Sequence, residues 1–79
     1  MDKTYSALEI ARYVTKYCTK NGWEISNLKL QKLLYYIQAY FVVSRGSICF
    51  IDSINCERSG PYVPYVKQLY FGYSIYNIE

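Results

Sequence analysis

Any catalysis by this sequence would have to proceed without histidine, because its 79 residues contain none. Histidine is the commonest general base, so most hydrolase arrangements are excluded. A nucleophilic serine or cysteine still needs a base beside it. The closest approach to an acid pair is Asp52 with Glu57, in one predicted loop, where carboxylates are usually solvated. The four glycines are too widely spaced for a phosphate-binding loop. We therefore predict a protein that is not an enzyme and carries no cofactor.

The three cysteines, Cys18, Cys49 and Cys56, are the other residues that could do chemistry. Their number is odd and no CxxC pair occurs, whereas metal sites need clustered thiolates or imidazoles. We predict no metal site and free thiols that pack as small buried residues in a reducing compartment. The apolar runs are too short to span a bilayer and the N-terminus lacks a signal-peptide pattern, so we expect a cytoplasmic protein without membrane contact.

Positive charge is concentrated in the first part of the chain. Residues 1–32 carry six basic and three acidic side chains, whereas residues 33–79 carry three of each. Basic residues with tyrosines between them can follow phosphates and stack on bases. A net charge of +3 is modest for that task, and a solvated helix face explains the same pattern. Nucleic acid is therefore the least favoured partner.

Tyrosine is unusually frequent, with eleven copies beside three phenylalanines and one tryptophan. Tyrosine, tryptophan and arginine anchor protein interfaces, although tyrosines at the rim of a core are also common. Two segments combine aromatic area with polar or charged tips, and we predict that they bind a partner protein. Their residues are Lys29, Lys32, Tyr36 and Tyr40 in the first, and Arg58, Gly60, Pro61, Tyr62, Tyr65 and, further along, Tyr70 in the second.

The first element that would position these residues is a helix over residues 6–20. It begins with a capping box formed by Ser6 and Glu9 and ends at Asn21-Gly22, since glycine tolerates the left-handed conformation after a helix. Its apolar residues recur at helical spacing and predict one buried stripe. The stripe consists of Ala7, Ile10, Ala11, Val14, Tyr17 and Cys18.

A second helix is predicted from about Asn27 to Ser44, with Ser26 as its N-cap and Arg45-Gly46 as its end. This segment is apolar on almost every side, which is typical of a helix in the middle of a fold. We therefore expect it to be contacted on at least two sides. The predicted core face consists of Leu30, Leu33, Leu34, Ile37 and Phe41.

The rest of the chain gives weaker signals. Residues 47–57 predict a briefly extended or irregular segment, and Ser59-Gly60-Pro61 predicts a break. Pro64 suits the first turn of a short third helix that would stop at Gly72. We expect an all-α or mainly α fold, with one domain of three helices over residues 1–79. One face of the third helix would carry Tyr62, Val66, Leu69 and Tyr70.

Two motifs of this chain look familiar. Residues 25–40, ISNLKLQKLLYYIQAY, resemble the signature helix of the Panacea antitoxin domain, also called the SocA-like or GepA phage-associated family. Residues 58–66, RSGPYVPYV, are similar to the family's Gly-Pro-Val-Val-Pro motif, although the aromatic residue that usually precedes Gly-Pro is missing. The likeness covers about residues 5–72. Family members continue for several more helices, so this chain resembles the N-terminal half of a Panacea domain.

The resemblance implies binding rather than catalysis. Panacea domains neutralise unrelated protein toxins by direct contact, and some hand a partner to a protease. We therefore expect an antitoxin-like module, or alternatively a phage-type inhibitor of a host defence system such as an anti-CRISPR protein. The short length further predicts an apolar face that a second copy covers in a homodimer. That face would comprise Tyr65, Leu69, Tyr70, Tyr73 and Tyr76.

Overall fold

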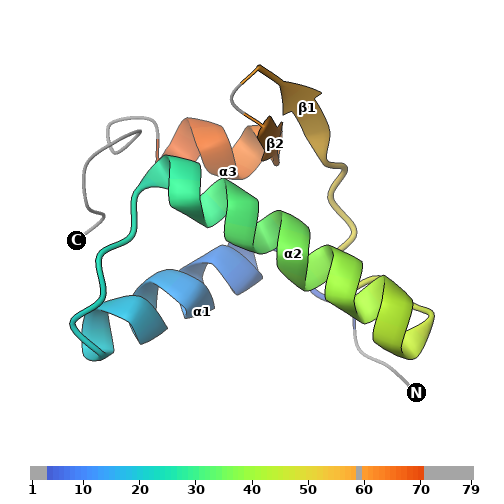
Figure 1. Ribbon diagram of the computed structural model, residues 1–79, viewed down its shortest axis with the longest axis horizontal. Coiled ribbons are helices and arrows are strands. Elements are labelled where there is room, and N and C mark those ends of the chain that lie inside the picture. Colours follow the sequence, from blue (N-terminus) through green and yellow to red (C-terminus); the bar gives the residue numbers. More distant parts are fainter. Residues whose placement is uncertain (1–3, 59, 71–79) are drawn as a thin grey trace.

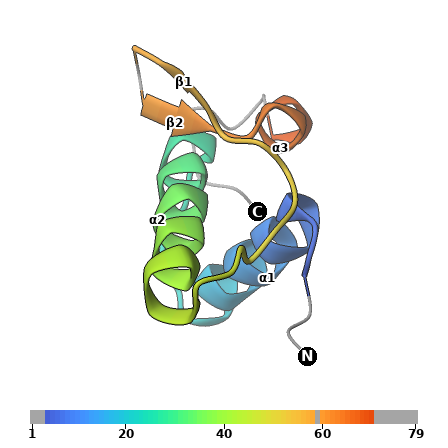
Figure 2. The same cartoon turned by 90° about the vertical axis from the view of Figure 1, so that its right-hand side faces the viewer.

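The computed structural model describes residues 4–58 and 60–70, which form three helices and one small hairpin (Figure 1). Helix α2 runs past the other elements, with α1 along one side and with α3 and the hairpin beside its first turns (Figures 1 and 2). The mainly α fold is confirmed, and the hairpin is an addition to it. The elements are α1 (Ala7–Lys20), α2 (Asn27–Arg45), β1 (Asn55–Glu57), β2 (Gly60–Tyr62) and α3 (Pro64–Leu69).

Helix α1 begins with the predicted capping box. The Ser6 hydroxyl accepts a hydrogen bond from the Glu9 N–H, and the Glu9 carboxylate accepts one from the Ser6 N–H, at 3.2 and 3.1 Å. A second carboxylate reaches the same turn from far along the chain, because Asp52 accepts from the Ala7 N–H at 2.7 Å. Free N–H groups at a helix start need such partners. Asp52 is therefore part of the helix cap rather than a solvated loop acid.

The buried side of α1 is narrower than the sequence predicts. Ala7, Ala11 and Cys18 are buried, but Tyr17 is 48% exposed. The prediction that Tyr17 belongs to the buried stripe is wrong. Its ring instead packs against exposed rings next to it, those of Tyr13 and the tryptophan after the helix.

Helix α2 has the predicted caps and most of the predicted core face. Leu30 and Leu34 are fully buried, and Ile37 and Phe41 pack against the same cluster. Leu33 is 39% exposed, so its assignment to the core is wrong. At 100° per residue, Leu33 lies on the edge of the apolar stripe that faces solvent, whereas the other four lie within it.

Buried amide groups join α2 to the hairpin and α3. The Gln31 side chain accepts from the Val63 N–H at 2.7 Å and donates to Asn27 at 2.9 Å, and Asn27 donates to the Lys67 carbonyl at 3.0 Å. Gln31 lies in the segment 25–40 and Val63 in the segment 58–66, the two motifs distinguished in the sequence. In this fold the two motifs are thus in direct contact through one buried hydrogen bond.

A second glutamine of α2 holds the segment that returns from the end of the helix. Gln38 accepts from the N–H groups of Cys49 and Phe50, at 2.8 and 3.2 Å, and donates to the Phe50 carbonyl at 2.8 Å. The same segment forms a short parallel bridge with Tyr5, beside the start of α1 (Figure 2). Gln38 therefore fixes the backbone at Phe50, the largest fully buried side chain.

The hairpin replaces the break predicted at residues 59–61. Strands β1 and β2 are antiparallel, with Cys56 opposite Pro61 and Glu57 opposite Gly60. Proline fits because both strands of a two-stranded sheet are edges, and Gly60 takes φ +119°, which favours glycine. Tyr62 consequently lies in β2 and not on the third helix as predicted. That helix does begin at Pro64, but it ends at Leu69 with Tyr70 as its C-cap, before the predicted stop at Gly72, which lies outside the described residues.

The core contains side chains from all three helices and from the segments between them. The buried hydrophobic residues are Ala7, Ala11, Cys18, Ile25, Leu30, Leu34, Cys49, Phe50, Val63 and Val66.

Within the described part of the chain, no helix has the combined length and hydropathy that crossing a membrane requires.

The cysteines are free thiols in two different environments. Cys18 and Cys49 are buried as predicted, but Cys56 is exposed on β1, so the expectation that it packs as a buried residue is wrong. Burial raises the pKa of the Cys49 thiol, and the positive charge of Arg45 offsets part of that rise. Because a thiolate is the reactive form, Cys49 is protected both by coverage and by protonation.

We accordingly expect iodoacetamide to modify Cys56 first in the native protein, with Cys18 and Cys49 reacting at measurable rates only when the fold opens. Mass spectrometry of tryptic peptides at successive times measures each site separately. In denaturant all three should react at similar rates, which provides the control. Native modification of Cys49 as fast as Cys56 would contradict the closed packing around Phe50.

Candidate functional site

The first predicted binding segment forms one continuous surface on α2. Lys29, Lys32, Tyr36 and Tyr40 follow each other at spacings of three and four residues, so they share one face of the helix. All four are exposed, with Tyr36 at 64% and Tyr40 at 63%. This surface, which we call the α2 row, lies opposite the buried Leu34. It presents two phenol rings and two ammonium groups to solvent.

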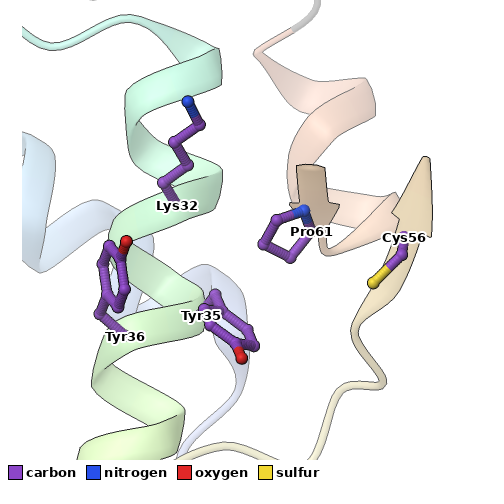
Figure 3. Close-up of a pocket in the computed structure, with 5 residues that line it drawn as sticks. All are labelled: Lys32, Tyr35, Tyr36, Cys56 and Pro61. Atoms are coloured by element: carbon purple, nitrogen blue, oxygen red, sulfur yellow. The ribbon is translucent and has the colours of Figure 1, made fainter. Parts of the chain in front are cut away.

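A pocket of about 310 Å³ connects the α2 row to the hairpin (Figure 3). Lys32, Tyr35 and Tyr36 line it from α2, and Cys56 and Pro61 line it from β1 and β2. The structure therefore brings together parts of both predicted segments, since Lys32 and Tyr36 come from the first and Pro61 from the second. The rings of Tyr35 and Tyr36 meet edge to face with centroids 5.7 Å apart.

The hairpin is held against α3 by one lysine. Lys67 forms an ion pair with Glu57, and its ammonium group lies 4.4 Å from the centroid of the Tyr62 ring. Glu57 is thus paired with a cation and not with Asp52. Tyr62 is half-buried under this contact, whereas Arg58 is exposed next to the hairpin turn. The ion pair joins α3 to β1, the strand that pairs with the one carrying Pro61.

The remaining predicted residues, Gly60, Tyr65 and Tyr70, are not among those that line this pocket. Gly60 is half-buried beside Lys32, whose Cε would lie 3.9 Å from a Cβ placed on that glycine. Tyr65 and Leu69 on α3 are 56% and 50% exposed, but Tyr70 packs against the core. The face predicted to form a homodimer is therefore open at Tyr65 and Leu69 and not at Tyr70. Its other two members, Tyr73 and Tyr76, lie outside the described residues.

The pocket presents hydrogen-bonding groups and aromatic rings together. It holds an ammonium, two phenols and a thiol, with no carboxylate among its lining residues. Residues 4–58 and 60–70 contain no cluster of three side chains that could hold a metal ion. Such a site suits hydrogen bonding and aromatic contact with an incoming side chain.

Sequence reasoning missed two lining residues, Tyr35 and Cys56. Tyr35 could have been found, because it follows Lys32 by three residues and therefore borders the same helical face. Cys56 could not, since its place depends on the register of a hairpin whose second strand was interpreted as a break. Comparison with known protein families, curated proteins and solved structures gave no match to this chain.

Proposed function

We propose that this protein is a non-catalytic, antitoxin-like binding module that neutralises or sequesters a partner protein by direct contact. The observation that carries the proposal is the α2 row, in which Tyr36 and Tyr40 are each more than 60% exposed on a rigid helix. Tyrosine is one of the side chains that anchor protein interfaces, and the two lysines of the row add positive charge to the same face. The neighbouring Val43, 85% exposed, extends the apolar part of the same face.

The side chains of the α2 row also indicate which groups a partner would need to present. Lys29 and Lys32 are exposed and form no ion pair with a described carboxylate, so acidic groups on the partner would complement them. The adjoining pocket can receive one apolar or aromatic side chain between Tyr35 and Pro61. The fitting partner therefore presents an apolar side chain beside one or two carboxylates.

A toxin and a host defence protein are both compatible with this description. An inhibitor of the anti-CRISPR type would use the same α2 row, and only the captured protein distinguishes the two functions. A homodimer is a third possible assembly, supported by the exposure of Tyr65 and Leu69 on α3.

A photoreactive amino acid at position 36 tests the proposal in cells that carry the gene. We expect a crosslinked protein adduct from position 36 and no protein adduct from position 13, a tyrosine of similar exposure on α1. Mass spectrometry then identifies the adduct, and an adduct of twice the chain mass reports the homodimer. Equal crosslinking from both positions would contradict a specific surface on α2.

With the purified partner, Tyr36→Ala and Tyr40→Ala should each weaken binding by about 30-fold, the effect of a residue that contributes about 2 kcal/mol. Tyr13→Ala is the matched control and should change the affinity by less than about twofold. Isothermal titration calorimetry measures all three variants. An unchanged affinity for Tyr36→Ala would remove the α2 row from the interface.

A further inference from the structure

A second exposed aromatic surface lies on α1, away from the residues of the α2 row. Tyr13, Tyr17 and Trp23 are 68%, 48% and 57% exposed. The rings of Tyr13 and Tyr17 are stacked with centroids 6.2 Å apart and an interplanar angle of 23°. Trp23 continues the series at 5.7 Å from Tyr17. Three exposed rings thus form one row, which we call the α1 ring row.

Three cations run parallel to this row. Arg12, Lys16 and Lys20 are exposed and four residues apart, so they repeat about every 6 Å along the helix. None of them forms an ion pair within the described residues. Of the nearby acids, Glu9 is engaged in the helix cap and Glu24 is exposed after the helix. The spacing of about 6 Å between successive cations is close to the distances of 6.2 and 5.7 Å between successive ring centroids.

Hydroxyl groups border the cations on the side away from the rings. A shallow depression of about 460 Å³ is lined by Thr15, Lys16, Thr19 and Lys20. Ammonium and hydroxyl groups are common donors to phosphate oxygens. The Thr15 hydroxyl donates instead to the Arg12 carbonyl at 3.1 Å, which leaves Lys16, Thr19 and Lys20 as the donors of this depression. Around the helix, hydroxyls are followed by cations and then by aromatic rings. This order corresponds to a phosphate track with base-stacking platforms beside it.

Although the net charge of +3 made nucleic acid the least favoured partner on composition, the local arrangement of rings and cations favours it at this face. We infer that this face of α1 binds single-stranded nucleic acid, with phosphates along Arg12, Lys16 and Lys20 and bases stacked on the α1 ring row. Positively charged tracks with adjacent aromatic rings are how proteins bind single strands without sequence preference. A duplex fits less well, because its paired bases are already stacked at about 3.4 Å and only its phosphates would reach the face. An acidic peptide would use the cations but leave the flat ring faces unoccupied.

Trp23 is the only tryptophan of the chain, so its fluorescence reports directly on the proposed site. Titration of the full-length protein with oligothymidylate at low salt should quench this fluorescence. If each of the three cations neutralises one phosphate, the plot of log K against log salt should have a slope of about −2, at about 0.7 per phosphate for single strands. Duplex DNA and polyglutamate serve as the competing ligands.

Paired variants separate this surface from general electrostatic attraction. Lys16→Gln with Lys20→Gln should reduce the salt slope to about −0.7, whereas Lys29→Gln with Lys32→Gln removes the same charge from the α2 row and should leave slope and affinity unchanged. Tyr17→Ala should weaken binding by at least about fivefold through lost stacking. All these side chains are exposed, and circular dichroism checks that each variant folds.

Three results would overturn the inference. The first is an absence of quenching by oligothymidylate at low salt. The second is equal binding of polyglutamate, which would identify the face as a site for acidic protein, or equal binding of duplex DNA. The third is an equal loss of affinity in the α1 and α2 double variants, which would mean that only net charge matters.

Discussion

Leu34→Ala should destabilise the protein by about 2–5 kcal/mol, the usual cost of opening a cavity at a fully buried leucine. Leu34 is 0% exposed and belongs to the single buried cluster of the described chain. A protein of this length has a free energy of unfolding of about 4–12 kcal/mol, at roughly 0.05–0.15 kcal/mol per residue. The variant should therefore be largely unfolded or melt far below wild type, as urea denaturation followed by circular dichroism would show.

The adjacent leucine provides the matched control. Leu33→Ala removes the same atoms from the same helix, but Leu33 is 39% exposed. This substitution should lower the free energy of unfolding by less than about 1 kcal/mol, because the Leu33 side chain buries less apolar surface than that of Leu34 and its removal leaves no closed cavity. A loss as large as that of Leu34→Ala would mean that the buried face of α2 is rotated from the one described above.

Gln31→Met should cost at least about 2 kcal/mol, although methionine has nearly the same length and a greater hydropathy. The change removes the acceptor for the Val63 N–H and the donor to Asn27 while both partners remain buried. Each buried polar group without a partner costs roughly 1–3 kcal/mol. The free energy of unfolding from urea denaturation is again the measurement.

Gln68→Met is the control for that substitution. Gln68 is exposed on α3, so the same replacement there should change the free energy of unfolding by less than about 0.5 kcal/mol. If Gln31→Met proved neutral, the contact between α2 and the hairpin would have to depend on apolar packing at Val63 and not on the amide. The affinity for the purified partner would be a second readout, because this contact positions Pro61 beside the α2 row.

The helices were predictable because the signals that begin and end them are local. The N-caps Ser6 and Ser26 each accept a hydrogen bond from an N–H group three residues further along the chain. Pro64 occupies the first turn of α3, where a missing N–H costs no hydrogen bond within the helix. The backbone at Gly46 has φ +69°, as expected of a glycine that ends a helix. These features need no knowledge of the tertiary fold, so the bounds of α1 and α2 agree with the sequence to within a residue or two.

The hairpin and the side chains that hold it were not predictable in the same way. A proline beside a glycine is typical of a turn, and only pairing with β1 makes Gly60 and Pro61 a strand. Gln31 and Gln38 look like ordinary helix residues until the segments that they bind are known. Cys56 reaches the pocket through the same pairing. Roles that depend on a partner distant in sequence are absent from local patterns.

The α2 row was identified correctly as one surface because helical periodicity alone groups Lys29, Lys32, Tyr36 and Tyr40. The distinction between a buried and an exposed apolar position was harder. Leu33 and Tyr17 satisfy the periodicity of a core stripe but lie at its edge, where a small rotation of the helix decides exposure. The middle of an apolar stripe is therefore a safer prediction than its margins.

The carboxylate of Asp52 on the first turn of α1 also has a consequence for the order of events during synthesis. This contact joins positions 45 residues apart, and the bridge between Tyr5 and Phe50 spans a similar length. Long-range contacts of this kind carry the entropy cost of closing a large loop before they stabilise anything. On the ribosome, the contact of Asp52 with the Ala7 N–H and the bridge between Tyr5 and Phe50 can form only after residues 49–52 emerge. The start of α1 therefore gains its last partners only after the whole of α2 has been synthesised.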